Sequence, residues 1–189
     1  MALISLKKYL VYKAPLSNVN TVYNNRYAAR DISLDDLEND EWLKEDKRSL
    51  LKLIESGHLG VVIFDKEKQT VAARAFIALN GKKPNHIPKV PKEVAWLHYA
   101  AVKKECRGQG LQNVMTVFLI QFIRKLNSKL DIYIDTGEDN MPSRINQNKL
   151  GLIENGVYTV LKIGTQRLPF GYIQFGFWNK KRKHPALVR

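Results

Sequence analysis

The apolar positions of the chain change their period several times, and each change predicts a new element. Apolar residues that alternate with polar ones, or run together briefly, are typical of strands, whereas a spacing of three to four positions is typical of helices. The predicted strands are residues 8–14, 59–65, 70–78, 93–102, 131–135, 156–163 and 170–178. The predicted helices are residues 16–29, one or two stretches within 33–54, residues 111–127 and residues 141–151. This mixed order indicates a single α/β domain built in layers, of the α+β kind.

Local signals place several of these boundaries. Ser33, followed by Asp36, has the pattern of a capping box at a helix start. Gly57 is the expected end of the helical segment, because glycine adopts the backbone conformation that follows a helix. The strand at 93–102 is apolar on both alternating faces, which predicts a central, buried position in the sheet. Residues 80–92 are rich in proline and lysine and predict a connection without regular structure.

A glycine loop joins the predicted central strand to the long apolar helix that begins at residue 111. Gly108 and Gly110 lie close together in this loop, and glycine lets the backbone turn so that several N–H groups point into one hollow. The helix start adds unpaired N–H groups, and Arg107 adds a full positive charge. These features predict a pyrophosphate site, although a plain surface turn would also contain two glycines. The spacing matches neither the P-loop nor the three-glycine dinucleotide fingerprint.

The same loop resembles a motif of a known family. Residues 102–110, with the core Arg107-Gly-x-Gly, resemble motif A of the GNAT-type acetyltransferases, which is commonly written Q/R-x-x-G-x-G/A. Glu105 occupies the first position of that motif and departs from it.

A second resemblance follows downstream. Asn140-x-x-Ser143, with residues 149–152 after it, resembles the N-x-x-A…Y-x-K-x-G-F segment of the same family. The resemblance covers residues 58–163 well and residues 1–57 only in outline.

The resemblance implies a fold and a ligand. The fold is a single GNAT-like domain over residues 1–179, with a central mixed, mostly antiparallel sheet flanked by helices, followed by a basic tail at 180–189. The ligand is acetyl-CoA, used as a co-substrate. The residues implied to bind it are Ala101, Val102, Arg107, Gly108, Gln109, Gly110, Leu111, Gln112 and Asn140. The backbone of 107–112 would hold the pyrophosphate, the end of the strand would pair with the pantetheine amide, and Asn140 would bond the pantetheine arm.

The resemblance also implies a catalytic base. Residues 97–102 resemble the L-H-x-x-A-V of the arylalkylamine N-acetyltransferases, in which the histidine helps to move a proton. His98 is therefore the predicted base, and the ordinary pKa of a histidine, about 6.5, suits proton transfer near neutral pH. A hydrogen-bonded core histidine on a buried strand would give the same pattern, and Glu93 is the second candidate base.

The acid of the family is missing. Gln147 occupies the position of the usual tyrosine, and an amide cannot donate a proton as an acid does. The loss is modest, because an ordinary thiol has a pKa near 8.5, so protonating the leaving thiolate at pH 7 is worth only about 2 kcal/mol. Water, Tyr158 or Tyr99 could serve instead. The departure leaves open that catalysis has been lost or that a different acceptor is used.

Charge is distributed unevenly along the chain. Lysine and arginine number 31 against 18 acids, a formal net charge of +13. Residues 31–46 hold eight of the acids and one base, so the rest carries 30 bases and 10 acids, a net +20. A field of that sign attracts phosphates, nucleic acid or an acidic cofactor, and CoA is a polyanion. A basic surface with no specific partner would have the same composition.

Composition excludes several classes. Hydrophobic residues at 44% and charged residues at 26% are ordinary globular values and argue against wholesale disorder. No apolar stretch approaches the ~20 residues of a membrane helix, and the first residues do not have the pattern of a signal peptide. The single cysteine, Cys106, excludes an intramolecular disulfide, and the four histidines lack the spacing of a zinc site. We therefore expect a cytoplasmic protein with no bound metal and no membrane contact.

The predicted function is an N-acetyltransferase, in which an acceptor amine attacks the thioester of acetyl-CoA directly. The acidic segment at 31–46 favours a cationic amine, whereas the basic connection and the basic tail favour RNA contact. The acceptor is therefore open among a small molecule, a protein and an aminoacyl-tRNA. The alternative is a non-catalytic module on the same fold that binds nucleic acid or a protein partner through its basic surface.

Overall fold

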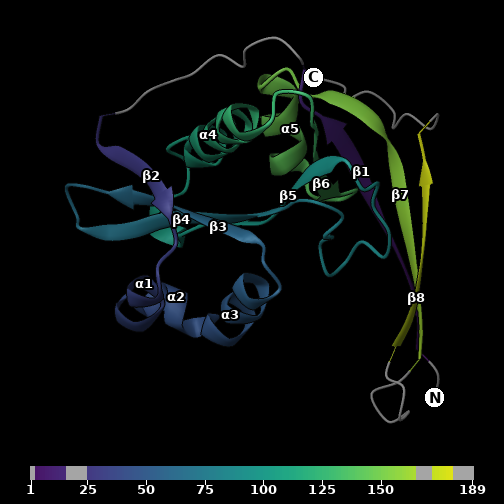
Figure 1. Cartoon of the computed structure of the whole chain (residues 1–189), viewed down its shortest axis with the longest axis horizontal. Helices are drawn as coiled ribbons and strands as arrows, with labels where there is room; N and C mark the ends of the chain where they lie inside the picture. Colours follow the sequence, from purple (N-terminus) through teal and green to yellow (C-terminus); the bar gives the residue numbers. More distant parts are fainter. Residues whose placement is uncertain (1–2, 16–24, 165–171, 181–189) are drawn as a thin grey trace.

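One eight-stranded sheet with helices on both faces organises the chain (Figure 1). The structure is a computed structural model that describes residues 3–15, 25–164 and 172–180. The strands are β1 (Leu3–Lys13), β2 (Tyr27–Asp31), β3 (Leu59–Asp65), β4 (Thr70–Ala78), β5 (Val94–Val102), β6 (Asp131–Gly137), β7 (Ile153–Gly164) and β8 (Tyr172–Asn179). The helices are α1 (Leu34–Asn39), α2 (Glu41–Glu45), α3 (Lys47–Glu55), α4 (Leu111–Leu126) and α5 (Met141–Lys149), with a short 3-10 turn at Lys104–Cys106.

The strands follow the order β2-β3-β4-β5-β6-β1-β7-β8. Among the described strands, β5 and β6 form the only parallel pair, and every other pair is antiparallel. The predicted fold class is therefore confirmed: one layered domain around a mixed, mostly antiparallel sheet.

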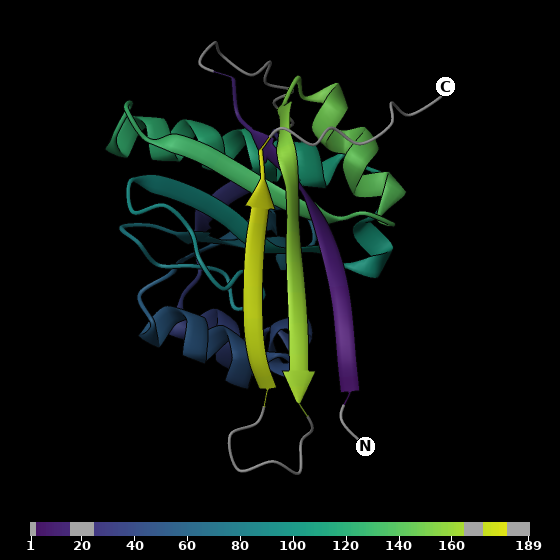
Figure 2. The ribbon, with the colours of Figure 1, turned by 90° about the vertical axis from the view of Figure 1, so that its right-hand side faces the viewer.

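The two faces of the sheet are covered differently (Figures 1 and 2). On one face α4 packs its buried apolar side chains against the middle strands, and this forms the largest core cluster. On the other face α1, α2 and α3 cover β3 and β4. Beside them the connection at 80–92 inserts the fully buried Ile87 into a third cluster with Trp96 and Tyr158.

Most predicted elements are confirmed, and two are not. The strands at 59–65 and 70–78 have the predicted bounds, and Ser33 and Asp36 form the predicted capping box. The helical stretch at 33–54 is three short helices rather than one or two. The predicted helix at 16–29 is wrong where it can be compared, because Tyr27–Asp31 is an edge strand paired with β3. Its residues 16–24, and residues 181–189 of the predicted tail, lie outside the described part of the chain.

The central strands separate at one place, and this positions the site. Pairing of β5 with β6 ends at Leu97 and Ile134, although both strands continue beyond these residues. β5 carries a bulge there, since its residues 99 and 100 stand opposite a single residue of β4. Tyr99 in the bulge has a φ of 53°, a left-handed conformation that costs energy in a residue other than glycine. The bulge turns the end of β5 away from β6.

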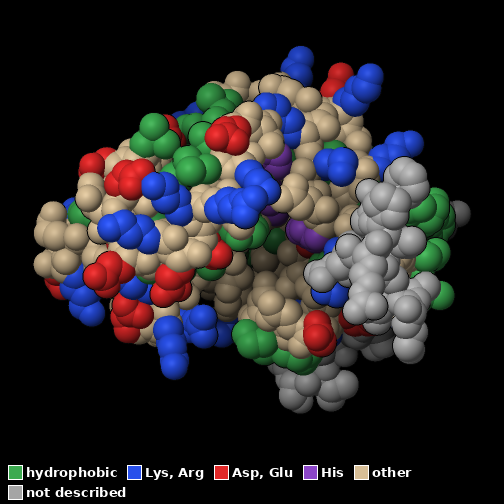
Figure 3. Space-filling model, turned by 90° about the horizontal axis from the view of Figure 1, so that it is seen from below, with side chains coloured by type: hydrophobic (Ala, Val, Ile, Leu, Met, Phe, Trp, Pro, Cys, Tyr) green, Lys and Arg blue, Asp and Glu red, His purple; other side chains and the backbone are tan. Residues whose placement is uncertain are grey.

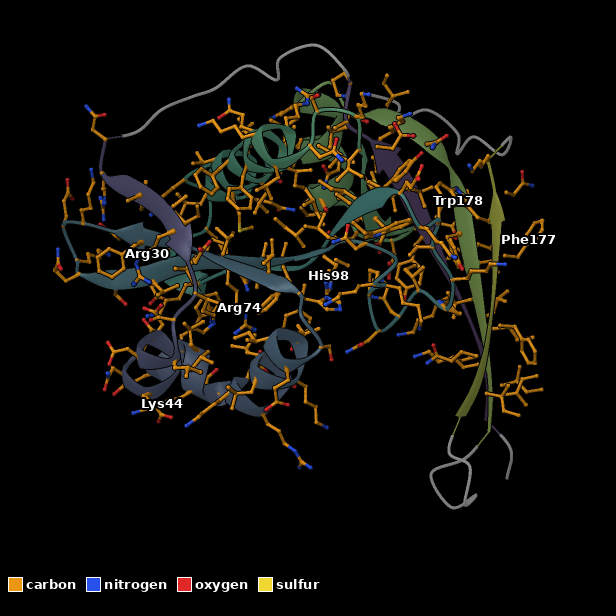
Figure 4. All side chains as sticks on the ribbon, viewed as in Figure 1. Arg30, Lys44, Arg74, His98, Phe177 and Trp178 are labelled. Atoms are coloured by element: carbon orange, nitrogen blue, oxygen red, sulfur yellow. The ribbon has the colours of Figure 1, made fainter. Side chains whose placement is uncertain are left out.

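The strands β1, β7 and β8 form a wing at one end of the sheet (Figure 2). Its inner face is packed, and Trp178 contributes there to the cluster around Trp96. Its outer face is exposed, and Phe177 points away from the molecule (Figure 4). The exposed large apolar residues of this wing are Ile4, Leu6, Ile153, Ile163, Ile173, Phe175 and Phe177. The aromatic strand predicted at 170–178 is β8 where it is described, with one packed and one exposed side, and residues 170 and 171 lie outside the described part of the chain.

Candidate active site

A cavity of about 310 Å³ lies where β5 and β6 separate. Its walls come from both of these strands, from α4 and α5, and from the connection at 80–92. Figure 3 views the molecule from the side of α1–α3 and shows histidine side chains at the edge of a hollow. Because the walls include elements from both faces of the sheet, groups supplied by α4 and groups supplied by the opposite face can meet in this cavity.

The glycine loop directly precedes α4, and the space above it is open. Gly108 and Gly110 have φ values of 78° and 71°, which only glycine adopts without strain. A Cβ built at either position would have no atom within 4 Å, so there is open space over the loop. No side chain caps the start of α4, and of its first three N–H groups only that of Asn113 donates within the turn, to the backbone oxygen of Gly110 at 2.9 Å. Arg107 is exposed beside them, and the loop has the form of an anion cradle.

Three further predicted residues tie this loop to its surroundings. The hydroxyl of Tyr27 donates to Oε1 of Gln109 at 2.5 Å, which joins the edge strand β2 to the loop. Leu111 is 2% exposed and anchors the first turn of α4 in the core. Nε2 of Gln112 donates to Oγ of Ser143 at 3.3 Å, which links α4 to α5 at the cavity wall. The contacts hold the start of α4 in place.

The end of β5 has one paired and one open edge. Ala101 and Val102 pair with β4 on one side, and β6 has already diverged on the other. The open edge leaves backbone groups available to an extended ligand that enters between the strands. Asn140 lines the cavity at the start of α5, where its Oδ1 accepts from the backbone N–H of Ser143 at 3.3 Å. Of these three residues only Asn140 lines the cavity, whereas Ala101 and Val102 follow the lining residue Ala100 along β5.

His98 lies on the face of the sheet turned toward α3 (Figure 4). Its Nε2 is 2.8 Å from Nδ1 of His58, and the two side chains are 6% and 7% exposed. Burial, with the nearby charges of His58 and His86, lowers the pKa of His98 to about 3. Burial and the charge of Lys82 lower the pKa of His58 as well. His98 is therefore neutral at pH 7, and it stays a prediction as the general base.

A second histidine site was missed in the sequence. Nε2 of His86 lies 2.7 Å from Oδ2 of Asp135, and the indole N–H of Trp96 donates to the other oxygen at 2.6 Å. His86 and Asp135 both line the cavity. His86 sits in an irregular connection and Asp135 lies 49 residues away on β6, so no local spacing could have indicated the contact.

Gln147 lies at the cavity wall, where the family pattern has tyrosine. The side chain is 2% exposed, and its Oε1 has no hydrogen-bond partner among the described residues. A buried carbonyl oxygen without a partner is costly, and a ligand that donates a hydrogen bond would satisfy it.

The remaining candidates for the base and the acid are Glu93, Tyr158 and Tyr99, and only Tyr99 lines the cavity. Glu93 is exposed, precedes β5 and does not line the cavity. The hydroxyl of Tyr158 donates to the backbone oxygen of Lys89 at 2.8 Å, so it holds the connection. Tyr99 is 39% exposed and lines the cavity.

The acidic segment at 31–46 has structural partners. Arg30 forms a two-pronged ion pair with Asp36, and Arg74 pairs with Asp46. Asp40 caps α2 and also accepts from the backbone of β4. The two ion pairs neutralise Asp36 and Asp46, so part of the segment's charge serves the packing of α1–α3.

Comparison with known proteins finds solved structures of similar fold but no protein of similar sequence. No family model matches the sequence, and no curated protein is similar to it in sequence. Among solved structures, a GNAT-family acetyltransferase from Colwellia psychrerythraea matches with a TM-score of 0.61 and 14% identity, over 86% of this chain and 57% of that one. A tandem GNAT protein from the clavulanic acid biosynthesis pathway matches with a TM-score of 0.57 and 15% identity, over 80% of this chain and 50% of that one.

A third match is the glucosamine N-acetyltransferase region of a fungal multi-domain GH3 β-N-acetylglucosaminidase. Its TM-score is 0.57 at 11% identity, over 84% of this chain and 21% of that chain. The chain thus spans about half the length of the first two solved structures and a smaller part of the third. Identities this low establish architecture alone. The chain has the fold of the GNAT-type acetyltransferases.

Proposed function

We propose that the protein transfers an acetyl group from acetyl-CoA to the amine of an acceptor, in the cavity between β5 and β6. The observation that carries the proposal is an open glycine loop before α4 and an unpaired edge at the end of β5, which adjoin the cavity-lining residues Gln112 and Ala100. Both features belong to a chain with the GNAT-type fold. A polyanionic, extended ligand with amide groups has the chemistry that this opening would bind.

The residues present fit acetyl-CoA. The backbone of 107–112 would receive the pyrophosphate, because two left-handed glycines and an uncapped helix start leave N–H groups facing open space. The open edge of Ala101 and Val102 would pair with the pantetheine amides, and Asn140 would contact the same arm. The unpartnered Oε1 of Gln147 offers an acceptor for an N–H of the ligand. When bound, acetyl-CoA supplies an acyl carbon that is activated toward attack by an amine.

The chain has histidines for proton transfer but no tyrosine where the family has its acid. His98 and His86 both line the cavity, so the amine proton has two candidate acceptors. Gln147 can orient a ligand through its amide but cannot protonate a thiolate. The thiolate of CoA needs little help at pH 7, since protonating an ordinary thiol there is worth only about 2 kcal/mol. Water or the exposed Tyr99 would supply that proton.

Binding of acetyl-CoA tests the proposal directly. A ligand that binds only the folded state stabilises it by about 2.7 kcal/mol at a hundred times its dissociation constant. We expect acetyl-CoA to raise the melting temperature of the wild type and to leave that of Gly108→Glu unchanged. Gly81→Glu is the matched control, because Gly81 also has a positive φ, 80°, but lies in the connection. Wild-type protein that shows no shift at millimolar acetyl-CoA would overturn the proposal.

The acceptor stays a prediction among a small amine, a protein and an aminoacyl-tRNA. RNA contact rests on net charge alone, and no contact or comparison supports it. The alternative of a non-catalytic module would be favoured by binding of acetyl-CoA without release of thiol in any acceptor assay. Among the described residues no helix is long and apolar enough to cross a membrane. A cytoplasmic location stays a prediction.

A further inference from the structure

His86 and Asp135 form a dyad in which the carboxylate is hidden and the imidazole is accessible. The Asp135 side chain is 5% exposed, whereas the side chain of His86 is 32% exposed. Asp135 uses both oxygens, one toward Nε2 of His86 and one toward the indole N–H of Trp96. The carboxylate is thus fixed by the sheet, and it holds one ring nitrogen of His86. The other ring nitrogen, Nδ1, has no hydrogen-bond partner among the described residues.

The connection that carries His86 is anchored on both sides of it. Ile87 is fully buried in the cluster beneath the connection. The backbone N–H and C=O of Lys89 both bond the hydroxyl of Tyr158, at 3.1 and 2.8 Å. The ring of Tyr9 on β1 packs against the His86 ring with centroids 4.9 Å apart. A catalytic side chain needs such support, because a loosely held group loses the geometry for proton transfer.

We propose that His86, held by Asp135, takes the proton from the acceptor amine during acetyl transfer. The inference rests on the proposed function. An alkyl amine is an ammonium ion at pH 7, and it gives one proton to Nδ1 of His86 before its nitrogen can attack. The neutral nitrogen then forms a bond to the acyl carbon as the carbon–sulfur bond breaks, and it releases a second proton to water. The electron pair of the broken bond stays on sulfur, which then takes up a proton from His86 or from water. An amide and a free thiol result, and charge and atoms balance.

The positive charge that forms on His86 has a counter-ion. A buried carboxylate on the far nitrogen fixes the tautomer of an imidazole and stabilises the imidazolium that forms when it accepts a proton. His98 has no carboxylate partner among the described residues, and its Nε2 is engaged by another histidine. A proton on His98 would place an unpaired charge in a buried site, which is why the pKa of His98 is lowered to about 3. The two histidines therefore differ in their capacity to hold the amine proton.

The titratable groups that face His86 come from three strands. Asp135 on β6 is in contact with it, Tyr9 on β1 packs against its ring, and His98 on β5 is close enough to sense its charge. Burial and the charge of Asp135 raise the pKa of Tyr9, so this phenol stays neutral at the pH of the assay. Asp135 is then the one anion in contact with His86 among the described residues.

Kinetics of three variants separate the two histidines. His86→Gln keeps a hydrogen-bond donor for Asp135 but cannot accept a proton, Asp135→Asn removes the counter-ion, and His98→Gln keeps a partner for His58. Thiol release from acetyl-CoA is measured with tyramine, spermidine and glucosamine as amine probes, and with water alone. We expect His86→Gln and Asp135→Asn to lose about a hundredfold or more in kcat/KM at pH 7, the range that a general base supplies. We expect less than a tenfold loss in His98→Gln.

The pH dependence, the affinity for acetyl-CoA and the tautomer of His86 distinguish a catalytic role from a structural one. The loss in His86→Gln should shrink as pH rises toward 10, where an amine is deprotonated without help. Acetyl-CoA affinity, measured by calorimetry, should stay within about threefold of wild type in all three variants. Asn85→Gln, an exposed neighbour on the same connection, is the control and should behave as wild type. Nitrogen-15 NMR of the histidine rings should report His86 with its proton on Nε2 and a bare Nδ1, and Asp135→Asn should lose this preference.

The possible results lead to different conclusions. If His86→Gln retains activity within threefold while His98→Gln loses it, the dyad proposal fails and the sequence-based prediction for His98 takes its place. If His86 carries its proton on Nδ1, the proposal also fails, whatever the kinetics. If the wild type neither binds acetyl-CoA nor releases thiol with any probe, the proposed function fails first, and the catalytic role of the dyad fails with it.

Discussion

Two histidine pairs each contribute one residue, His98 or His86, to the cavity wall, and they differ in the partner that binds that residue. The His58–His98 pair is buried, and each ring has another ring as its partner at 2.8 Å. The His86–Asp135 dyad is partly open, and its partner is a buried carboxylate at 2.7 Å. The first site disfavours protonation, because within the described part of the chain the two buried imidazoles have no negative charge beside them to balance an imidazolium. The second provides that charge, so the same residue type can have opposite roles a short distance apart.

The difference teaches that the partner of a histidine is set by the tertiary structure and not by its place in a motif. His98 lies in a run that resembles a family motif, whereas His86 lies in a connection with no motif. The contact with Asp135 is visible only once β6 and the connection are folded together. Three predictions test this comparison, from the largest expected effect to the smallest.

Removing the carboxylate should cost the most stability. Asp135→Ala leaves the indole N–H of the fully buried Trp96 and the ring of His86 without their partner, so we expect a loss of about 3 kcal/mol in the free energy of unfolding. Urea denaturation measures it. Asp131→Ala on the same strand is the control: its ion pair with Lys13 is partly exposed, and we expect a loss under about 1 kcal/mol. Equal losses in the two variants would show that the dyad adds no special constraint.

Removing His58 should lower the free energy of unfolding by less than removing Asp135 does. His58→Ala leaves Nε2 of the buried His98 without its hydrogen bond, and we expect a loss of about 2 kcal/mol, within the range for an unsatisfied buried polar group. His58→Gln can restore a bond to His98 and should lose about half as much. Chemical denaturation at pH 8, where both histidines are neutral, measures the two losses. If His58→Ala is as stable as wild type, the two rings do not support each other in solution.

Acidification should weaken the protein gradually, through the buried pair. The pKa values of His98, about 3, and of His58 lie below the ordinary value of about 6.5, so the unfolded chain binds more protons below that pH. Their contribution is complete above pH 6.5 and is lost as pH falls, by at most about 1.4 kcal/mol per pH unit for each histidine. The bonded Arg26 lowers the pKa of Asp65 to about 2, so its contribution is lost only below about pH 4.

Stability curves between pH 7 and 5 therefore isolate the histidines. We expect His98→Gln to flatten the curve relative to wild type in this range, while the loss below pH 4 persists in both proteins. Thermal melting at half-unit steps of pH gives the comparison. A wild-type curve as flat as that of His98→Gln would mean that His98 takes up its proton without cost, and the contrast between the two histidine sites would be lost.

Much of the fold followed from local patterns. The hairpin of β3 and β4 has the bounds that its apolar residues predicted, since each strand is framed by glycine or turn residues. The capping box at Ser33 formed because its two groups are only three residues apart. The sequence predicts helix where the structure has the strand β2, because an edge strand has few neighbours and carries a weak apolar signal. Pairing with β3 decides its conformation.

The sequence by itself determined the glycine loop, the central strand and the long helix, and through them a resemblance to one family of folds. Those features depend on residues that are close together in the chain, so glycine positions and the spacing of apolar residues are enough to predict them. Tertiary structure alone decided where β5 leaves β6, that His98 is buried against His58, and that His86 meets Asp135. Burial and pairing between distant residues set the charge that a side chain can hold, and no local spacing encodes them.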